Sequence, residues 1–574
     1  MRRLTAFLLS LPVTFLIALQ LPARAICTPM PEVVSWATLH GECVAANVAR
    51  YLLSLAAAVA LALVLRARPV PQPPPPAARA ARIDPLLLFL ALVVVFNAGL
   101  RVSLAAPLVD TFHEGEALAF GPAFSRPEPF LHAAMVHGFG TDVLPDLLGR
   151  RLFPGSPIAG MRLFRTAEAI LFFAGLLWAL FEIAAYEDDL RRRRAMRLVA
   201  AGLALPLLSL AGFEHELLRK SFAMLQLASM LRAMRTDRGA LWVLLGASVV
   251  PAIFYNYAEG FAAALVLGVT LIAARRRRIV WVAAGGAVTA GLAVAWVGLP
   301  QLREIVRQIS YWGQLGGRTW MLPIGQEWPQ VAFLFAPLVA AQALALTQLR
   351  RDRPELWLCL LASLSGFRLW TDRADDFHLA IAAAASLPLV FALVLRGLPP
   401  PRPAPSRLPP WLLPAALLAL GLVPIAPFDT LGVVRLGRTV AAAAREAQTP
   451  DSAIVAPSYL AAAAALRPTA GKCIFTLTSE GVWYHLLDRP SCSRFHHLIY
   501  ARTPEVQEEI VAALEREKPS LLVVDNPFWS NRIDGVPVSA TNAIVWRYVM
   551  LHYRPDRVVG THALYRRADR AVSR

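Results

Sequence analysis

Three carboxylates and a histidine lie within seven positions of the segment "PLVDTFHEGEALAFGPAF", directly after an apolar run. They are Asp110, His113, Glu114 and Glu116. On a helix, Asp110 and Glu114 would share a face, because they are four positions apart. Like charges held together raise the pKa of at least one member, which suits a general base or a metal site. The alternative is a solvated loop without chemistry, but Gly115 between two acids favours a tight turn that aims side chains inward.

A second charged cluster lies in the segment "FRLWTDRADDFHLA", between two apolar runs. Its members are Arg368, Asp372, Arg373, Asp375, Asp376 and His378. Arginine and histidine at the boundary of a membrane could bind a lipid-linked phosphate through charge-assisted hydrogen bonds. The alternative is an ion-paired turn that only closes a helical hairpin.

Two further charged turns have the same kind of position. The segment "YNYAEGF" contains Glu259 beside an apolar run, where a charge is costly unless it faces a cavity. The segment "GFEHELLRKSF" contains Glu214, His215, Glu216, Arg219 and Lys220. Each turn is a weak signal by itself, but four charged turns on one face of a helical bundle could line a single cavity.

Other chemistries lack their sequence signatures. His113 with its two neighbouring glutamates resembles part of a metal site, but the chain has no HExxH motif. It has no GxSxG motif of a serine nucleophile. The C-terminal segment has no GxGxxG or GxxxxGK[ST] motif for nucleotide binding. A transporter would be expected to carry charges at mid-membrane and to show matched halves, and the sequence shows neither pattern.

The composition indicates that membrane helices position these turns. Of the 574 residues, 57% are hydrophobic and only 17% are charged, which is typical of a polytopic membrane protein. The net charge of +18 comes mainly from arginines in short clusters between apolar runs. This pattern is typical of topology signals rather than of nucleic-acid binding.

Apolar runs predict roughly 13 membrane spans. The runs begin near Leu4, Val48, Pro85, Leu163, Leu198, Ser221, Leu241, Phe261, Ile279, Val331, Leu356, Leu379 and Trp411. With the N-terminus in the cytoplasm, the arginine-rich loops fall on the cytoplasmic side, as the positive-inside rule requires. All four charged turns and the C-terminus are then outside. The first run could instead be a signal peptide that is cleaved after Ala25.

Changes in composition divide the chain into four parts. We predict an N-terminal transmembrane hairpin with an outer loop (1–68), a Pro-rich cytoplasmic linker (69–82), a transmembrane core (83–427) with outer loops at 106–160 and 300–328, and an extracytoplasmic α/β domain (428–574). In the last part, "KCIFTLTSE" and "SLLVVDN" are predicted strands. The segments "RLGRTVAAAAREA", "TPEVQEEIVAALEREKP" and "AIVWRYVMLHY" are predicted helices, and "RVVGTHALYRR" a terminal strand or hairpin. Strands that alternate with helices indicate a small α/β domain.

Four of the five cysteines form two pairs in predicted outer segments. Cys27 and Cys43 share the first outer loop, and Cys473 and Cys492 share the C-terminal segment, whereas Cys359 lies alone in a span. Pairs on the oxidising side of a membrane predict two disulfides. The alternative is four unrelated free thiols.

Together these features resemble the GT-C polytopic glycosyltransferases, which use polyprenyl-phosphate sugars on the outer face of the membrane. The resemblance is carried by "DTFHEGE", "YAEG", "DRADDFH" and "TSEGVWYHLLDRPSCSRF", by a multi-span core over about residues 83–400, and by the C-terminal domain. The chain departs from the mannosyl and aminoarabinosyl transferases of this family, because its first loop lacks their adjacent Asp-Glu pair.

The resemblance implies transfer of a sugar from a polyprenyl-phosphate donor to an envelope glycan, lipid or protein, on the outer face of a bacterial inner membrane. An acceptor hydroxyl would attack the anomeric carbon while a carboxylate takes its proton, which inverts the configuration. We predict Asp110 as this base. Glu114 and Glu116 would position the acceptor or hold a divalent cation such as Mg or Mn.

Arg373 and His378 would neutralise the leaving phosphate. The other predicted substrate-binding residues are His113, Glu259, Arg368 and Asp375. Two alternatives stay open: a lipid or glycan transporter or flippase, and a membrane scaffold whose C-terminal domain binds a partner. Convergence of Asp110, Arg373 and His378 on one outward cavity would favour the enzyme.

Overall fold

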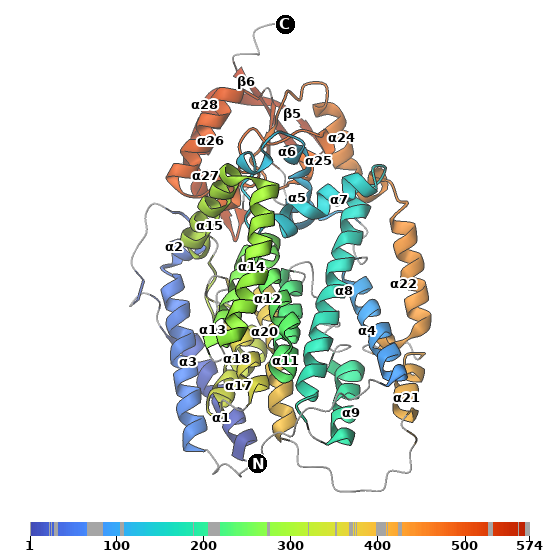
Figure 1. Ribbon diagram of the computed structural model, residues 1–574. Coiled ribbons are helices and arrows are strands. Elements are labelled where there is room, and N and C mark those ends of the chain that lie inside the picture. The colour runs from blue at the N-terminus through green and yellow to red at the C-terminus, as the bar shows by residue number, and fades with distance from the viewer. Residues whose placement is uncertain are drawn as a thin grey trace.

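The computed structural model shows a long helical bundle with a smaller domain that contains a sheet at one end (Figure 1). The structure describes residues 2–21, 23, 26–27, 33–65, 84–103, 108–187, 189–204, 219–272, 276–319, 321–349, 353–366, 371, 373–374, 376–397, 409, 411–422, 428–519, 521–525, 532–560 and 562–568. The N-terminus lies at the end of the bundle opposite this domain. The predicted helical bundle is therefore confirmed.

The N-terminal hairpin packs onto a later part of the bundle. Helix α1 (Arg2–Gln20) lies against α3 (Val44–Val64), and both contact α17 (Ala336–Leu346). The buried side-chain amide of Asn47 donates to the backbone carbonyl of Leu322 at 2.9 Å. A buried amide needs such partners, so this contact fixes the hairpin against the bundle.

Helix α8 (Pro157–Ala184) forms the centre of the bundle. It packs between α4 (Pro85–Ser103) and α11 (Ser221–Thr236). Phe172 and Leu176 are fully buried, and most of the apolar side chains of α8 are buried with them. Between Ala169 and Phe181 this helix is apolar on all sides, which is typical of such a central position.

The remaining bundle helices surround α8 or extend from it. They are α9 (Leu190–Val199), η4 (Ala200–Ala204), α12 (Gly239–Tyr255), α13 (Tyr257–Ile272), α14 (Arg276–Val297), α16 (Trp328–Gln330), η6 (Val331–Phe335), α18 (Pro354–Ser365), α20 (Asp376–Gly397), α21 (Leu412–Leu420) and α22 (Val433–Glu446). The predicted helix after residue 428 is α22. It packs beside α4 along the bundle rather than within the sheet domain (Figure 1).

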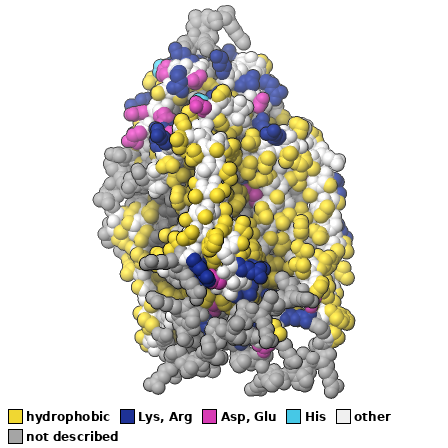
Figure 2. All heavy atoms as spheres, viewed as in Figure 1, with side chains coloured by type: hydrophobic (Ala, Val, Ile, Leu, Met, Phe, Trp, Pro, Cys, Tyr) yellow, Lys and Arg dark blue, Asp and Glu magenta, His cyan; other side chains and the backbone are white. Residues whose placement is uncertain are grey.

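Among the described residues, three helices are long and apolar enough to cross a membrane: Val44–Val64, Pro157–Ala184 and Arg277–Val297. Shorter apolar helices accompany them, so the predicted number of about 13 spans stays a prediction. Figure 2 shows hydrophobic side chains over the middle of the bundle, while Lys, Arg, Asp and Glu side chains gather over the C-terminal domain and in a smaller group toward the other end of the bundle. This distribution fits a bundle embedded in lipid with a hydrated domain at one end.

The C-terminal domain is built on a four-stranded sheet with the order β1-β2-β6-β5. Its elements are α23 (Asp451–Ile454), α24 (Pro457–Leu466), β1 (Phe475–Thr476), α25 (Val482–Leu487), η8 (Leu498–Tyr500), α26 (Pro504–Glu517), β2 (Leu521–Asp525), α27 (Val538–Thr541), α28 (Ala543–His552), β5 (Tyr553–Val559) and β6 (His562–Arg567). A separate hairpin joins β3 (Arg532–Ile533) to β4 (Val536–Pro537). Strand β1 is parallel to β2, and the other neighbours in the four-stranded sheet are antiparallel.

Several elements of this segment coincide with the helices and strands that the sequence patterns predict, while the division of the chain at residue 428 stays a prediction. The two predicted strands contain β1 and β2, the two predicted helices within the sheet domain are α26 and α28, and the terminal segment is the hairpin of β5 and β6. The helices α24 and α25 were not predicted. Strand β1 is shorter than the predicted strand, because the chain turns after Thr476 toward α25.

The first long loop lies between the bundle and the C-terminal domain (Figure 1). It contains α5 (His113–Leu118), α6 (Gly121–Phe124), η2 (Pro129–Leu131), η3 (Phe139–Val143) and α7 (Leu144–Leu152). The second predicted loop is largely the amphipathic helix α15 (Leu299–Thr319), which lies beneath the same domain. A short α2 (Trp36–His40) belongs to the N-terminal hairpin.

Both predicted disulfides are present. Cys27 is bonded to Cys43 beside the N-terminal hairpin, and Cys473 to Cys492 in the C-terminal domain. Cys359 is buried in α18 as a free thiol. The second bond joins the segment before β1 to the loop that leads to η8.

Candidate functional site

The first loop and the C-terminal domain touch through their backbones at two glycines. A Cβ atom on Gly481 would overlap the carbonyl oxygen of Gly115, and a Cβ on Gly115 would lie 3.0 Å from the backbone nitrogen of Val482. Beside this contact, Thr111 donates to the buried carboxylate of Glu480 at 3.4 Å. The segments "DTFHEGE" and "TSEGVWYHLL" are therefore in direct backbone contact. Glycine is required at this contact, which we call the glycine joint, because a side chain would keep the two backbones apart.

Asp110 stabilises the start of α5. One carboxylate oxygen accepts hydrogen bonds from the backbone nitrogens of Phe112 and His113, both at 2.9 Å. The other oxygen lies 2.8 Å from Nδ1 of His113. Burial raises the pKa of Asp110, but the bonds and charge of His113 lower it more, to about 2. The carboxylate is thus ionised at neutral pH and holds the turn that leads into α5.

Glu114 is held by a buried arginine of the bundle. The guanidinium of Arg162 donates to both oxygens of Glu114, at 2.7 and 3.0 Å, and to Glu446 of α22 at 2.9 Å. Arg162 also donates to the carbonyl of Leu108. A bidentate pair of this kind fixes α5 to α8. The charge of Glu114 is therefore engaged in structure.

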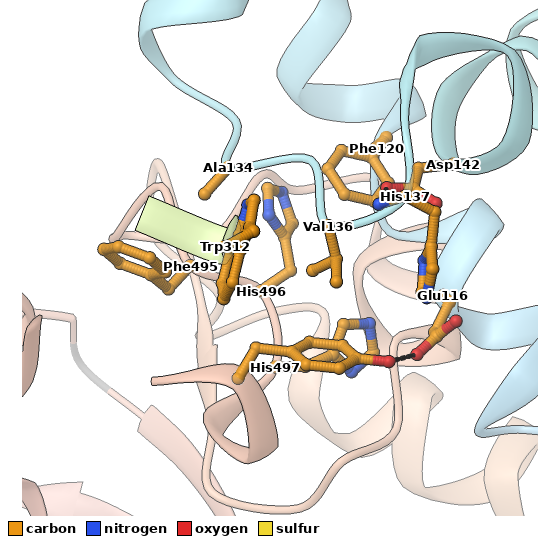
Figure 3. A pocket seen from close by; sticks show the side chains of 11 residues that line it. Glu116, Phe120, Ala134, Val136, His137, Asp142, Trp312, Phe495, His496 and His497 are labelled. Atoms are coloured by element: carbon orange, nitrogen blue, oxygen red, sulfur yellow. Dashed lines mark hydrogen bonds and ion pairs between the residues drawn. The ribbon is translucent and has the colours of Figure 1, made fainter. Parts of the chain in front are cut away.

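Glu116 faces a cavity between the first loop and the C-terminal domain (Figure 3). The cavity is lined by Glu116, Phe120, Ala134, Val136, His137, Asp142, Trp312, Phe495, His496, His497 and Tyr500. The hydroxyl of Tyr500 donates to the Glu116 carboxylate, and the guanidinium of Arg219 lies 4.0 Å from its other oxygen. The cavity volume is about 10 Å³, which is room for about one water molecule.

A buried aspartate–histidine pair lies on the same wall. Asp142 of η3 accepts from the backbone nitrogen of His137 at 2.8 Å, and its second oxygen lies 3.1 Å from His137 Nδ1. Burial raises the pKa of Asp142, but His137 and then Arg219 lower it more, so the net shift is downward. Gly138, with a φ of +140°, makes the turn that brings the pair together.

Two neutral histidines of the C-terminal domain complete the cavity. His496 Nδ1 lies 3.0 Å from the carbonyl oxygen of Arg494, so Nδ1 carries the proton and donates. Its Nε2 has no hydrogen-bond partner among the described residues. Burial lowers the pKa of His496 to about 3. Burial likewise lowers the pKa of His497, although the charge of Glu116 acts in the opposite direction.

The third and fourth charged turns meet beside this cavity. Lys220 lies 2.9 Å from both carboxylate oxygens of Glu259, and both side chains are buried. Its neighbour Arg219 approaches Glu116. Glu259 is thus neutralised by a lysine instead of lining the cavity. The other members of the fourth turn, Glu214, His215 and Glu216, lie outside the described residues.

The second charged turn contacts the C-terminal domain at another place. The guanidinium of Arg373 donates to both oxygens of Asp534, at 2.8 and 3.0 Å. Burial lowers the pKa of Arg502 to about 10, and Asp534 acts to raise it. His378 is half-buried in α20. Arg373 and His378 do not line the cavity, and neither does Asp110.

Two predicted substrate-binding residues, Arg368 and Asp375, lie outside the described residues. His113 is described and is bound to Asp110. Within the described ranges, no group of three or more His, Cys, Asp and Glu side chains is placed to hold a metal ion. Metal binding by Glu114 and Glu116 therefore stays a prediction.

Several cavity residues were not predicted from the sequence. Of its lining, only Glu116 belongs to the predicted site; the others come from the first loop, from α15 and from the segment 495–500. The signal that could have found them is the pair of adjacent histidines in "CSRFHHLIY", which follow a disulfide cysteine in an otherwise apolar stretch.

No family and no curated protein matches the chain in sequence. Two solved structures are similar to it: ArnT from Cupriavidus metallidurans bound to undecaprenyl phosphate, with a TM-score of 0.43 and 14% identity, and the apo state of the same protein, with a TM-score of 0.44 and 15% identity. Each alignment covers 84% of the present chain and 97% of the ArnT chain. TM-scores and identities this low describe overall shape and assign neither substrate nor residues.

Proposed function

We propose that the chain is a membrane glycosyltransferase whose site is the cavity between the first loop and the C-terminal domain. The observation that carries the proposal is the position of Glu116. Its carboxylate faces the cavity together with Asp142, His137 and Tyr500, at the end of a bundle with an apolar surface. The resemblance of the sequence motifs to GT-C glycosyltransferases implies that the donor is a sugar linked to polyprenyl phosphate.

In the proposed reaction, an acceptor hydroxyl attacks the anomeric carbon of the donor. The new bond joins the acceptor oxygen to this carbon, and the bond to the phosphate oxygen breaks with inversion. The hydroxyl proton passes to the carboxylate of Glu116, and the lipid phosphate leaves with the bonding electrons. A positioned general base of this kind contributes about 10² to 10⁴ in rate.

Glu116 is a better base in this geometry than Asp110. A base must be within hydrogen-bond reach of the proton that it takes. Asp110 accepts from two backbone nitrogens and His113 and lies off the cavity lining, and Glu114 is held by Arg162. We assign Asp110 and Glu114 as positioning residues of α5.

Cations near the cavity would stabilise the leaving phosphate, because donors aimed at developing charge lower the barrier. Arg219 lies 4.0 Å from Glu116. Arg373 is the second candidate, with His378 further along the same turn. Arg373 would have to exchange Asp534 for the phosphate. Such exchange is favourable only if the donor brings at least an equal negative charge.

A cavity of about 10 Å³ does not hold a sugar. The first loop and the C-terminal domain therefore have to separate when substrates enter, as lids do in many enzymes. The positive-inside pattern puts this site on the outer face of an inner membrane. There an envelope glycan, lipid or protein would be the acceptor.

The test is envelope glycan labelling in a deletion strain complemented with Glu116→Gln at equal expression. The substitution keeps the size of the side chain and removes the basic oxygen. We expect labelling to fall about 10²- to 10⁴-fold. Glu128→Gln, an exposed acid of the same loop, is the matched control and should leave labelling unchanged.

Full labelling with Glu116→Gln would remove this residue from the mechanism. Absence of any glycan difference between wild type and the deletion strain would refute the glycosyltransferase itself. Purified protein with an undecaprenyl-phosphate sugar gives a second readout, since release of undecaprenyl phosphate reports the same bond cleavage.

A further inference from the structure

An open groove adjoins the cavity on the side away from Glu116. It lies between α15, the start of α26 and the segment around Phe495, and its volume is about 240 Å³. The cavity and the groove share three lining residues: Ala134, Trp312 and Phe495. In Figure 3, Trp312 and Phe495 lie opposite the side that holds Glu116, His137 and Asp142. The groove and the cavity are therefore adjacent and share one wall.

Aromatic side chains form the floor of the groove, where Tyr311 is partly exposed and Trp312 and Phe495 are 6% and 4% exposed. The ring of Tyr311 lies 4.7 Å from that of Trp312 and 6.3 Å from that of Phe495, between centroids. The indole nitrogen of Trp312 donates to the carbonyl of Met135 at 2.8 Å, which fixes the ring. Trp312 also lies 6.0 Å from Tyr500, the residue that donates to Glu116. The aromatic floor thus leads to the proposed base.

Charged groups form the rim. Arg494 donates to both oxygens of Glu509, at 2.6 and 2.9 Å, and its guanidinium lies 5.0 Å above the Phe495 ring. Arg307 and Glu505 are exposed on the same rim. Behind the rim, Glu304 accepts from Arg494 and lies 3.0 Å from Arg307, so the rim carries no excess of positive charge.

The combination of floor and rim selects one chemical class. An aromatic face is electron-rich and attracts the polarised C–H bonds on the face of a sugar ring. Carboxylates and guanidinium groups at the rim would bond to its hydroxyls. A polyanion would require excess positive charge, which the balanced rim does not provide, and a lipid chain would leave the charged rim unpaired.

We propose that this groove binds the terminal saccharide of a neutral acceptor glycan and directs its hydroxyl past Trp312 toward Glu116. The role of this saccharide as the acceptor rests on the proposed glycosyltransferase function, whereas binding of a saccharide in the groove does not. A volume of about 240 Å³ is below the range of about 300 to 1,000 Å³ that is typical of complete small-molecule sites. The groove therefore holds the end of the acceptor, and the remainder extends into solvent.

The test is saturation-transfer NMR on the full-length protein in detergent with three neutral probes, maltotriose, mannotriose and chitotriose, and with a Ser/Thr-rich peptide as a separate arm. We expect transfer to the ring protons of at least one saccharide, both in wild type and in Glu116→Gln. Tyr311→Ala should reduce the transfer at least fivefold. Glu505→Ala and Arg307→Ala, exposed rim variants that do not threaten folding, should reduce it about threefold.

Trp328→Ala replaces an exposed aromatic residue away from the groove and serves as the control, with transfer expected to equal that of wild type. In turnover assays with the undecaprenyl-phosphate sugar, the rim variants should raise the KM for the acceptor about threefold and leave the KM for the donor unchanged. Three results would each overturn the proposal: signals from the peptide alone, the absence of a saccharide signal in wild type, or saccharide signals that survive Tyr311→Ala. Saccharide binding together with an active Glu116→Gln would instead refute the proposed catalytic role and leave the groove assigned.

Discussion

Acidification should destabilise the C-terminal domain through His496. This histidine is buried on the cavity wall, and burial lowers its pKa to about 3. In the unfolded chain the same imidazole titrates near about 6.5. Below that value the unfolded state binds a proton that the folded state does not, so stability falls as the pH falls.

The size of the effect follows from the two pKa values. Between about pH 7.5 and about pH 5.5, the folded imidazole stays neutral while the unfolded one becomes charged, and the loss in free energy of unfolding is about 1.4 kcal/mol. For a domain of this size that corresponds to about 3 to 6 °C in Tm. The pKa of His497 is also lowered by burial, so His497 adds a loss of the same sign.

The assay is thermal unfolding of the purified full-length protein, followed by intrinsic fluorescence at both pH values. His496→Asn removes the titration and keeps a side-chain amide that can donate to the Arg494 carbonyl in place of Nδ1. The control is His552→Asn, which replaces a partly exposed histidine of the same domain. We expect the drop in Tm to be about 3 to 6 °C smaller in His496→Asn than in wild type, and unchanged in His552→Asn.

An equal drop in wild type and His496→Asn would refute the reasoning, whatever the absolute stability of the variant. It would mean that His496 is protonated in the folded domain, and hence that the cavity is hydrated. A cavity of that kind would also change the electrostatics on which the proposed role of Glu116 depends.

Three other perturbations test the contacts that hold the site. Gly481→Ala should lower both stability and transfer, because its Cβ overlaps the Gly115 carbonyl; a normal melting curve would contradict the backbone contact. Replacing Cys473 and Cys492 by serine should cost about 3 kcal/mol in the chain-entropy model, measured by denaturant unfolding, and an unchanged midpoint would contradict it. Arg162→Met leaves the carboxylates of Glu114 and Glu446 without their cation and should lower the free energy of unfolding by about 3 to 5 kcal/mol, measured by denaturant unfolding. A rise in the free energy of unfolding would show that water solvates the two carboxylates.

Local patterns in the sequence predicted the local parts of the fold. The helix α26, the strand β2 and the hairpin of β5 and β6 follow from periodicities that a few residues set. The two disulfides followed from pairs of cysteines close in sequence. The exact packing of α22 along the bundle did not follow, because its arginines and alanines are compatible with a hydrated helix as well as with a surface beside α4.

The site itself could be predicted only in part, because its walls come from distant segments. Glu116 and Tyr500 are 384 positions apart. His137 and Asp142 lie in the first predicted outer loop, outside the four charged turns. The periodicity of hydrophobic residues in a sequence cannot predict a contact between segments so far apart. This contact depends on the close approach of the two backbones at Gly115 and Gly481. The prediction that Arg373 shares the cavity had only one basis, namely that both segments were expected on the same side of the membrane. In the structure Arg373 is instead paired with Asp534.

The three acids of "DTFHEGE" lie within seven positions but have different partners, and this difference leads to a final prediction. Asp110→Asn keeps an oxygen that can accept from the backbone nitrogens of Phe112 and His113, but it loses the charge that pairs with His113. Folding stability should therefore fall modestly, because the pair is partly exposed, and transfer per folded molecule should stay within about threefold of wild type.

Asp110→Ala removes the acceptor as well and should cost about 1 kcal/mol more in stability than Asp110→Asn, with transfer reduced in proportion to the folded fraction. Glu116→Gln should instead lower transfer about 10²- to 10⁴-fold at unchanged stability. Measuring unfolding and glycan labelling on the same three variants separates an acceptor that holds the turn from a base. If Asp110→Asn abolished transfer at full stability, Asp110 would be the base, and the cavity lined by Glu116 would have to open far enough to expose it to the acceptor.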